Sequence, residues 1–168
     1  MNAQEIYLFH QTPPDLAKRL IEFLPLEEGD VVCEPFRGEG AFYNAIPEQC
    51  QKVWAEITMG KDYKDITESY DWVITNPPFR LEQDNSRING FWLTLDYFTQ
   101  RANKGVAFLF NKKCLEALTP KRLQMLEQRG WFVKQIIVCS VKKWAGRYYF
   151  LILTKEPQTS FSYLRENW

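Results

Sequence analysis

Residues 105–111 read GVAFLFN, a run too continuously apolar for a strand with one face in water. Such a strand belongs in a sheet that helices cover on both faces. Shorter apolar runs occur in residues 30–36 and 70–75, while residues 14–24 and 87–103 carry apolar side chains at helical spacing. This alternation of strands and helices predicts an α/β fold around a mostly parallel sheet.

The last third of the chain predicts a different arrangement. Residues 131–141 and 147–155 are two apolar strands joined by the short connection KKWAG, which favours a C-terminal antiparallel hairpin. We expect residues 156–168 to form a surface tail anchored by aromatic side chains. With 168 residues and no linker or repeat, residues 1–168 are expected to form a single domain.

Composition limits the classes of function. Basic and acidic side chains number 21 each, so any contact with a polyanion must come from a local patch. The four cysteines form no Cys-x-x-Cys pair and His10 is the only histidine, so we expect no metal site. The sequence has neither a signal-peptide pattern nor an apolar run near 18 residues. We therefore expect a cytoplasmic protein without membrane contact.

A glycine turn, CEPFRGEGAF, follows the first predicted strand. In parallel sheets ligands bind beyond the carboxyl ends of strands, and Gly38 and Gly40 allow a backbone to approach closely. Tyr43 stands where the dinucleotide fingerprint has its third glycine, which disfavours a pyrophosphate cofactor. Glu34 would repel phosphate and attract an ammonium group.

Glu56 ends the next predicted strand and offers two acceptor oxygens for the hydroxyls of a ribose. S-adenosylmethionine contains an ammonium group and a ribose but no phosphate, so it is the cofactor that these residues favour. The alternative is that Gly-x-Gly is an ordinary turn and that each acid is a solvated surface group.

The third apolar strand runs into Asn76, Pro77, Pro78 and Phe79. Asn-Pro-Pro can be a simple turn, because proline favours extended geometry in the residue before it. It can also direct the Asn76 side-chain oxygen and the Pro77 carbonyl at one planar amino group. Two acceptors there would favour a pyramidal nitrogen and stabilise the positive charge that develops as it attacks a methyl sulfonium. Phe79 would offer a surface for base stacking.

Three segments carry a resemblance to a known family. VITNPPF looks like the Asn-Pro-Pro-aromatic motif of amino methyltransferases, EPFRGEG resembles their cofactor loop, and FHQTPPDLA is similar to their threonine-containing N-terminal segment. The order of the segments, over roughly the first 80 residues, is that of the gamma-type adenine-N6 DNA methyltransferases. The resemblance implies a Rossmann-like class I methyltransferase fold.

The same resemblance implies residue roles. Asn76 and Pro77, with Pro78, would hold the target amino group, Phe79 would stack on the target base, and Thr12 would touch the methionine carboxylate. Glu56 would take the ribose and Asp62 the adenine amino group. The full set of implied cofactor contacts is Thr12, Glu34, Pro35, Phe36, Gly38, Gly40, Glu56, Ile57, Asp62 and Tyr63.

The sequence departs from the family in two places. Only five residues separate Glu56 from Asp62, so we expect the helix between the second and third strands to be reduced or absent. The cofactor's adenine side would then be open. No separate target-recognition domain is expected either, so recognition could depend on a specificity partner.

The connection within the C-terminal hairpin should lie beside the active site. Lys142, Lys143, Trp144 and Arg147 combine charge with an aromatic ring, which suits phosphate contact and base stacking. The alternative is a hairpin tip that lysines keep soluble. Lys112, Lys113, Lys121 and Arg122 could extend a basic rim or be ordinary solvated residues.

The leading functional hypothesis is methyl transfer from S-adenosylmethionine to adenine N6 in nucleic acid, DNA more than RNA. Methylation of RNA, methylation of a protein glutamine at N5, and an inactive cofactor-binding subunit remain alternatives. Cytosine-C5 methylation is disfavoured, because its cysteine nucleophile usually follows proline and no Pro-Cys occurs.

Overall fold

The structure is a computed structural model that describes residues 11–78, 90–144, 146–157 and 162–167. Its strands form one seven-stranded sheet in the order β2-β1-β3-β4-β6-β5-β7. The strands are β1 (Val31–Glu34), β2 (Gln51–Trp54), β3 (Trp72–Thr75), β4 (Gly105–Asn111), β5 (Phe132–Ser140), β6 (Tyr148–Thr154) and β7 (Ser162–Asn167). The helices are α2 (Pro14–Ile21), α3 (Ala41–Ala45), α4 (Gly90–Thr99), α5 (Lys112–Leu115) and α6 (Pro120–Gln128).

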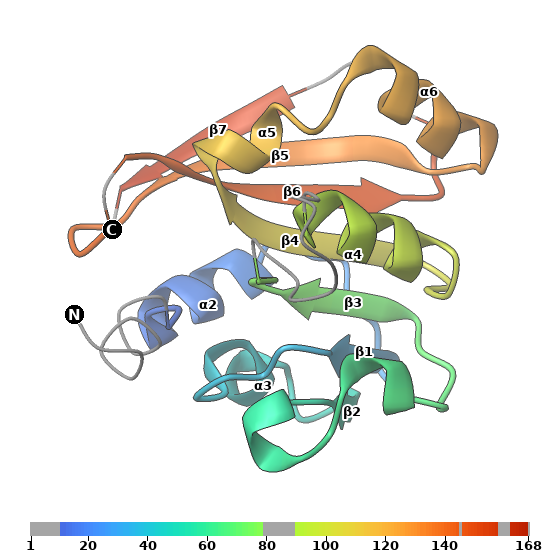
Figure 1. The fold of residues 1–168 in the computed structure, drawn as a ribbon. Helices are drawn as coiled ribbons and strands as arrows, with labels where there is room; N and C mark the ends of the chain where they lie inside the picture. Colours follow the sequence, from blue (N-terminus) through green and yellow to red (C-terminus); the bar gives the residue numbers. More distant parts are fainter. Residues whose placement is uncertain (1–10, 79–89, 145, 158–161, 168) are drawn as a thin grey trace.

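Helices cover both faces of this sheet, as the apolar strands predict (Figure 1). Against one face, α2 and α3 pack in a cluster that includes Leu20, Phe42 and Ile74. Against the other, α4 and α6 pack in a cluster that includes Phe98 and Leu126. The chain therefore has three layers, with the sheet in the middle, and β4 is buried on both faces as its sequence requires.

Strand directions follow the predicted pattern. Parallel pairs join β1 to β2, β1 to β3, β3 to β4 and β5 to β7, and β6 runs antiparallel to both β4 and β5. The C-terminal antiparallel hairpin is thus confirmed. The expectation of a surface tail was wrong for residues 162–167, which pair with β5 as an additional edge strand. The expectation was based on apolar patterns, and the polar composition of residues 162–167 gives no such pattern.

Two short 3₁₀ helices, η1 (Ile57–Met59) and η2 (Tyr63–Asp65), connect β2 to β3 in place of an α-helix. This confirms the expected reduction. Within the described residues β2 is an edge strand of the sheet. Tyr63 packs against Phe36, with ring centroids 5.1 Å apart, and against Phe98 at 5.8 Å. Aromatic packing therefore helps to hold this short connection against the sheet.

Gly105 begins β4 directly beside Trp72 of β3. A Cβ atom on residue 105 would overlap the buried Trp72 indole ring. We predict that Gly105→Ala lowers the free energy of unfolding by about 1–3 kcal/mol through overpacking. Urea denaturation of Gly105→Ala, Trp72→Leu and the double variant measures this. The loss from Gly105→Ala should shrink when residue 72 is leucine, and strict additivity of the two losses would contradict the account.

Candidate cofactor and amino-group site

A cavity of about 380 Å³ opens at the carboxyl ends of β1, β2 and β3. This volume lies in the range of about 300–1,000 Å³ that is typical of small-molecule sites. Residues from the N-terminal segment, the glycine loop, η1 and the Asn-Pro-Pro segment form its walls. They are Gln11, Thr12, Glu34, Phe36, Arg37, Gly38, Ala41, Glu56, Ile57, Thr58, Asn76, Pro77 and Pro78.

The glycine loop after β1 is shaped by two residues with positive φ, Gly38 at 52° and Gly40 at 84°. The Gln11 side chain lies against Gly38, and its Oε1 accepts a hydrogen bond from the Glu39 amide at 3.0 Å. A Cβ atom on residue 38 would collide with that Oε1 atom. The left-handed backbone angle therefore favours glycine at position 38, and a larger residue there would also displace the Gln11 side chain.

Glu34, the last residue of β1, has a side chain that fits a cationic ligand. It is only 2% exposed, and its Oε2 has no hydrogen-bond partner among the residues that the structure describes. Burial raises the pKa of the Glu34 carboxyl well above its ordinary value, against smaller opposing effects of a backbone hydrogen bond and of Arg37. A buried carboxylate without a partner is costly, and a ligand ammonium group would remove that cost.

Glu56 connects the end of β2 to the glycine loop. Its Oε2 accepts from the Gly38 amide at 2.7 Å, and its Oε1 accepts from the amide and hydroxyl of Thr58 at 3.1 and 2.7 Å. The carboxylate thus fixes the positions of the loop and of η1 on either side of the cavity. Glu56 can bind ribose hydroxyls only by sharing these oxygens or by releasing Thr58.

Asn76 follows β3 directly and lies against the N-terminal segment. Its Nδ2 donates to Thr12 Oγ1 at 3.3 Å, which orients the amide oxygen Oδ1 away from Thr12. Thr12 and Pro77 are buried, whereas Asn76 and Pro78 are partly exposed in the cavity wall. Phe79 lies outside the described residues.

Gln11 and Thr12 join the three parts of the site. Beside its contact with the glycine loop, Gln11 accepts a hydrogen bond at its backbone carbonyl from Lys143 Nζ at 2.7 Å. Thr12 holds Asn76 through the hydrogen bond described above. The N-terminal segment thereby ties the glycine loop, the Asn-Pro-Pro segment and the connection between β5 and β6 together.

The structure brings nine of the predicted site residues into the cavity wall and leaves others elsewhere. The nine are Thr12, Glu34, Phe36, Gly38, Glu56, Ile57, Asn76, Pro77 and Pro78. Pro35 and Gly40 shape the loop without lining the cavity, while Asp62 caps η2 by accepting from the Lys64 amide at 2.8 Å. Tyr63 packs behind Phe36.

Among the predicted substrate residues, Trp144 differs from the other three. Its ring is 4% exposed and packs on Tyr148, with the centroids 4.3 Å apart, so it belongs to the core. Lys142, Lys143 and Arg147 are exposed around it. The placement of Trp144 agrees with the alternative of an ordinary hairpin connection and removes its ring from base stacking.

Sequence reasoning missed four residues of the cavity wall, Gln11, Arg37, Ala41 and Thr58. Arg37 and Ala41 belong to the glycine turn CEPFRGEGAF, and Thr58 follows Glu56 by two residues. Proximity to these motifs was the available signal. No group of three or more potential metal ligands occurs within the described part of the chain. Among its helices, none is long and apolar enough to cross a membrane.

The sequence matches no protein-family model and no curated protein. Solved structures do resemble it. A putative class I S-adenosylmethionine-dependent methyltransferase from Listeria monocytogenes superimposes with a TM-score of 0.68 at 13% identity, covering 95% of this chain and 66% of that one. A modification subunit of a putative type I restriction enzyme from Vibrio vulnificus YJ016 gives 0.64 at 11%, covering 92% and 46%.

A putative RNA methyltransferase from Pyrococcus horikoshii gives a TM-score of 0.62 at 16% identity and covers 89% of each chain. This chain therefore spans about two-thirds of the Listeria protein and less than half of the Vibrio subunit, but nearly all of the Pyrococcus protein. The shared arrangement of strands and helices identifies the fold of this chain as the Rossmann-like fold of class I methyltransferases.

Proposed function

We propose that this chain is an S-adenosylmethionine-dependent methyltransferase that modifies the N6 amino group of adenine in nucleic acid. One observation carries the proposal: the Asn76-Pro77-Pro78 segment and the buried Glu34 line the same cavity. A carboxyl group suited to an ammonium ion and acceptors suited to a planar amine therefore lie on the walls of one cavity.

The cavity is suited to S-adenosylmethionine. Glu34 Oε2, buried and unpartnered, would bind the ammonium group of the methionine part. Glu56 would meet the ribose, and Ile57, which is 68% exposed, would cover part of the adenosine. When bound, S-adenosylmethionine supplies a methyl group attached to a positively charged sulfur.

The residues of this chain act on the other reactant. Asn76 Oδ1 and the Pro77 carbonyl would each accept one N–H of the target amino group. That geometry withdraws the nitrogen lone pair from conjugation and stabilises positive charge on the nitrogen as the new N–C bond forms. The bond between the methyl group and the sulfur breaks as the N–C bond forms, so the sulfur leaves as a neutral thioether. One of the two original protons then leaves the nitrogen, and the methylated amine is neutral. The hydrogen bond from Asn76 Nδ2 to Thr12 holds the amide in the required orientation.

Charge is distributed unevenly along the strand direction, although the chain has no net charge. Five exposed cations lie on the two connections that follow the carboxyl ends of β4 and β5, and they are Lys112, Lys113, Lys142, Lys143 and Arg147. The Lys112 amide donates to the Arg147 carbonyl at 3.2 Å, so the two connections adjoin. None of the five forms an ion pair with any residue that the structure describes.

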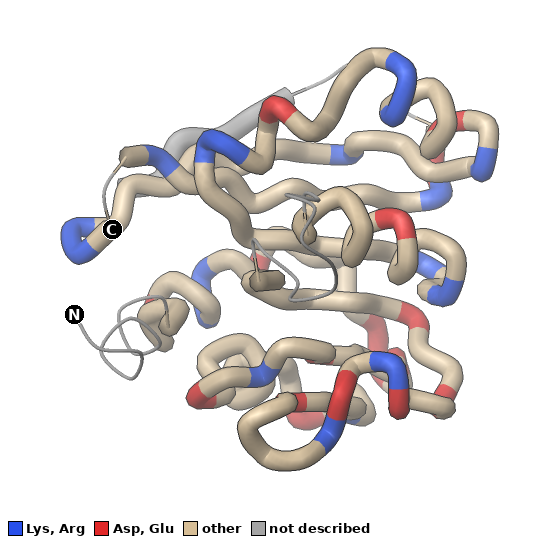
Figure 2. The backbone as a smooth tube through the Cα atoms, in the orientation of Figure 1, with Lys and Arg blue, Asp and Glu red and all other residues tan. Residues whose placement is uncertain are grey.

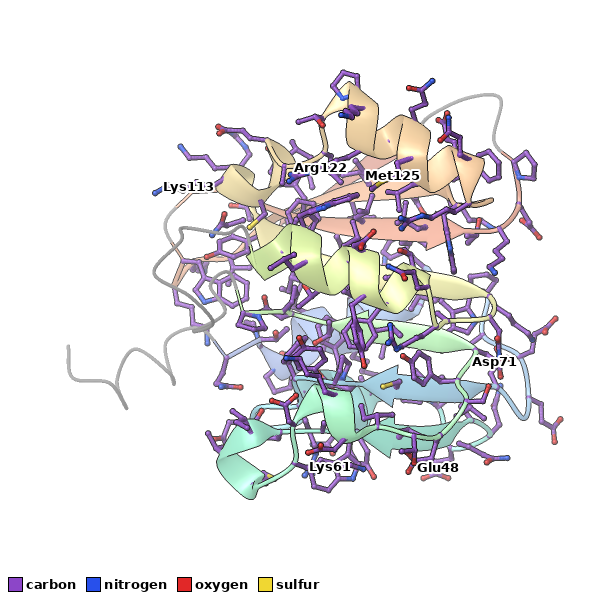
Figure 3. The ribbon with its side chains drawn as sticks, turned by 45° about the vertical axis from the view of Figure 1, so that its right-hand side comes forward. Glu48, Lys61, Asp71, Lys113, Arg122 and Met125 are labelled. Carbon is purple, nitrogen blue, oxygen red and sulfur yellow. The ribbon has the colours of Figure 1, made fainter. Side chains whose placement is uncertain are left out.

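Acidic residues lie at the opposite ends of the strands, interspersed with lysines and arginines (Figure 2). The acidic residues are Glu27, Glu28, Asp30, Glu48, Glu68 and Asp71. Figure 3 shows Lys113 at one end of the molecule and Glu48 and Asp71 at the other. The five exposed cations lie at the end that carries the cavity and could contact a polyanion. They support a nucleic acid as the substrate.

RNA is the second candidate substrate. The solved structure matched over 89% of its own length is described as a putative RNA methyltransferase, whereas the DNA modification subunit is matched over 46% of its length. Measuring whether DNA or RNA receives the methyl group distinguishes the two candidate substrates.

Asn76→Ala tests the catalytic segment. Loss of one acceptor should reduce methyl transfer by roughly a hundredfold or more while the affinity for S-adenosylmethionine stays within about twofold. Transfer of a labelled methyl group and calorimetric cofactor titration measure the two quantities. Asn103→Ala is the control, because Asn103 bonds to Ser69 and Asp71 at the far ends of the strands. An active Asn76→Ala protein would refute the assigned site.

Glu34→Gln tests the ammonium site through pH. Because burial raises the Glu34 pKa, the carboxyl stays protonated in the free protein at pH values where an exposed glutamate is ionised. A bound ammonium favours the ionised form, so cofactor affinity should increase as pH rises toward the raised pKa. In Glu34→Gln the affinity should fall roughly tenfold or more and lose this pH dependence.

The stability of the free protein should decrease with rising pH over the range in which cofactor affinity increases. Above the ordinary glutamate pKa the unfolded chain ionises while folded Glu34 does not, so Glu34 reduces stability as pH rises up to its raised pKa. Glu34→Gln should therefore raise the melting temperature at neutral pH. The matched control is Glu39→Gln, an exposed glutamate of the same loop. A Glu34→Gln protein that keeps both the affinity and the pH dependence of the wild type would contradict the assignment.

The cationic surface is tested by replacing four of its members with alanine, Lys112, Lys113, Lys142 and Arg147. Affinity for a nucleic-acid oligonucleotide should decrease, and the slope of log K against log salt should fall by roughly one for each phosphate that the variant no longer neutralises. Fluorescence anisotropy over a salt series measures this. Lys134→Ala serves as the control, since Lys134 pairs with Glu156 at the opposite end of the sheet. An unchanged salt slope would exclude this surface as the nucleic-acid contact.

A further inference from the structure

One lysine of the connection between β5 and β6 makes a contact that the neighbouring cations do not make. Lys143 Nζ donates to the backbone carbonyl of Gln11 at 2.7 Å, although the two residues are 132 positions apart in the sequence. The other four exposed cations of this surface form no side-chain hydrogen bond within the described part of the chain. Lys143 thus reaches the wall of the cavity, which Gln11 lines.

The Lys143 ammonium group is partly dehydrated where it meets Gln11. Burial lowers the pKa of this ammonium from the ordinary lysine value, and Nζ lies 5.6 Å from the centroid of the Trp144 ring. That ring is buried against Tyr148 and gives the ammonium a fixed apolar surface beside the carbonyl. A hydrogen bond from a charged donor is stronger than one between neutral groups, and partial dehydration strengthens it further. The contact is therefore able to hold a backbone group in position.

The backbone that Lys143 holds is stiff. The Gln11 carbonyl belongs to the planar peptide group that links Gln11 to Thr12, so a rotation of this group displaces Thr12. Pro13 follows and restricts Thr12 to extended geometry. The Pro13 carbonyl accepts from the Ala17 amide at 3.0 Å, which anchors the segment to α2. The position of Thr12 thus depends on α2 on one side and on the contacts of Gln11, with Lys143 among them, on the other.

Thr12 in turn contacts the proposed acceptor of the target amino group. Its Oγ1 accepts from Asn76 Nδ2 at 3.3 Å, and both residues line the cavity. The proposed reaction requires the Asn76 side-chain oxygen in a fixed place, and an error of about 1 Å in such a position can reduce the rate by roughly a hundredfold. One peptide group and two hydrogen bonds therefore connect Lys143 to the reacting end of the site.

We propose that Lys143 is a positioning residue for methyl transfer, which fixes Asn76 through Thr12 and does not serve as a phosphate contact. The inference rests on the proposed function and divides the cationic surface into two roles. Lys142 and Arg147 are exposed beside Lys143 without its hydrogen bond, so their charges stay available to phosphate. A phosphate contact acts on affinity for the polymer, whereas a positioning residue acts on the rate after binding.

The experiment is a double-mutant cycle on steady-state methyl transfer to DNA or RNA, whichever the wild-type protein methylates. Lys143→Met should lower kcat roughly tenfold and leave KM for the polymer within about twofold of the wild type. Thr12→Val removes the hydroxyl that holds Asn76 and keeps the branched shape. Because both changes break the same chain of contacts, adding Lys143→Met to Thr12→Val should lower kcat by less than about threefold.

Two further variants separate the contact from a general effect of charge. Lys143→Arg keeps a charged donor, so its kcat should stay within about threefold of the wild type. Lys18→Met is the matched control, because Lys18 is exposed on α2 and forms no side-chain hydrogen bond or ion pair within the residues that the structure describes. It makes the same chemical change near the same segment, and its kcat and KM should equal those of the wild type.

A second measurement does not depend on catalysis. NMR of the free protein follows the side-chain amide resonances of Asn76, which Asn76→Ala identifies by their loss. These resonances should shift in Lys143→Met, because the contact that positions Thr12 is lost, and they should stay in place in Lys18→Met. If Thr12→Val does not fold, these resonances and the kinetic constants of Lys143→Met still decide.

The outcomes separate the two proposals. The role of Lys143 would be overturned by strictly additive effects in the cycle, by a raised KM with unchanged kcat in Lys143→Met, or by Asn76 resonances that do not move in that variant. Each of these results leaves the proposed function standing. A wild-type protein that methylates adenine in neither DNA nor RNA would overturn both proposals.

Discussion

Parallel pairing of β1 with β3 aligns Cys33 with Val73, and the positions of the candidate site residues depend on this register. Glu34 follows the pair by one residue and Asn76 by three, so both emerge at the same edge of the sheet. Hydrogen bonds then extend the arrangement outward. Glu56 holds the glycine loop at Gly38, and Thr12 holds the amide of Asn76. A change in the β1–β3 register would separate the two halves of the site.

The same framework leaves Glu34 Oε2 buried in the cavity without a hydrogen-bond partner among the described residues. Glu34 is fixed at the end of a buried strand and is only 2% exposed, so its carboxyl group does not reach solvent. Such an arrangement costs stability in the free protein and favours a ligand with matching charges. The exposed cations after β4 and β5 are suited in the same way to a larger, polyanionic reactant.

Sequence alone predicted the strand ends well, because a buried strand such as β3 has a clear apolar pattern and Asn76 directly follows it. It failed where the pattern does not reveal the direction of a side chain. The sequence around Trp144 does not indicate whether its ring faces solvent or the core. Asp62 caps η2, the 3₁₀ helix that occupies part of the shortened connection, which the sequence did not indicate; its contact with the cofactor stays a prediction. The sequence alone suggests that Arg37 is an ordinary surface cation, whereas the structure shows its guanidinium against the Tyr43 and Trp54 rings.

Nucleoside mass spectrometry tests the central claim most directly. DNA and RNA are each incubated with S-adenosylmethionine and with wild-type protein or Asn76→Ala, then digested and analysed. The account predicts N6-methyldeoxyadenosine from DNA, or N6-methyladenosine if RNA is the substrate, with the wild-type protein and not with the variant. Methylation at another atom, or equal N6 methylation by Asn76→Ala, would contradict the account. So would the absence of a methylated base from both polymers while the protein binds the cofactor.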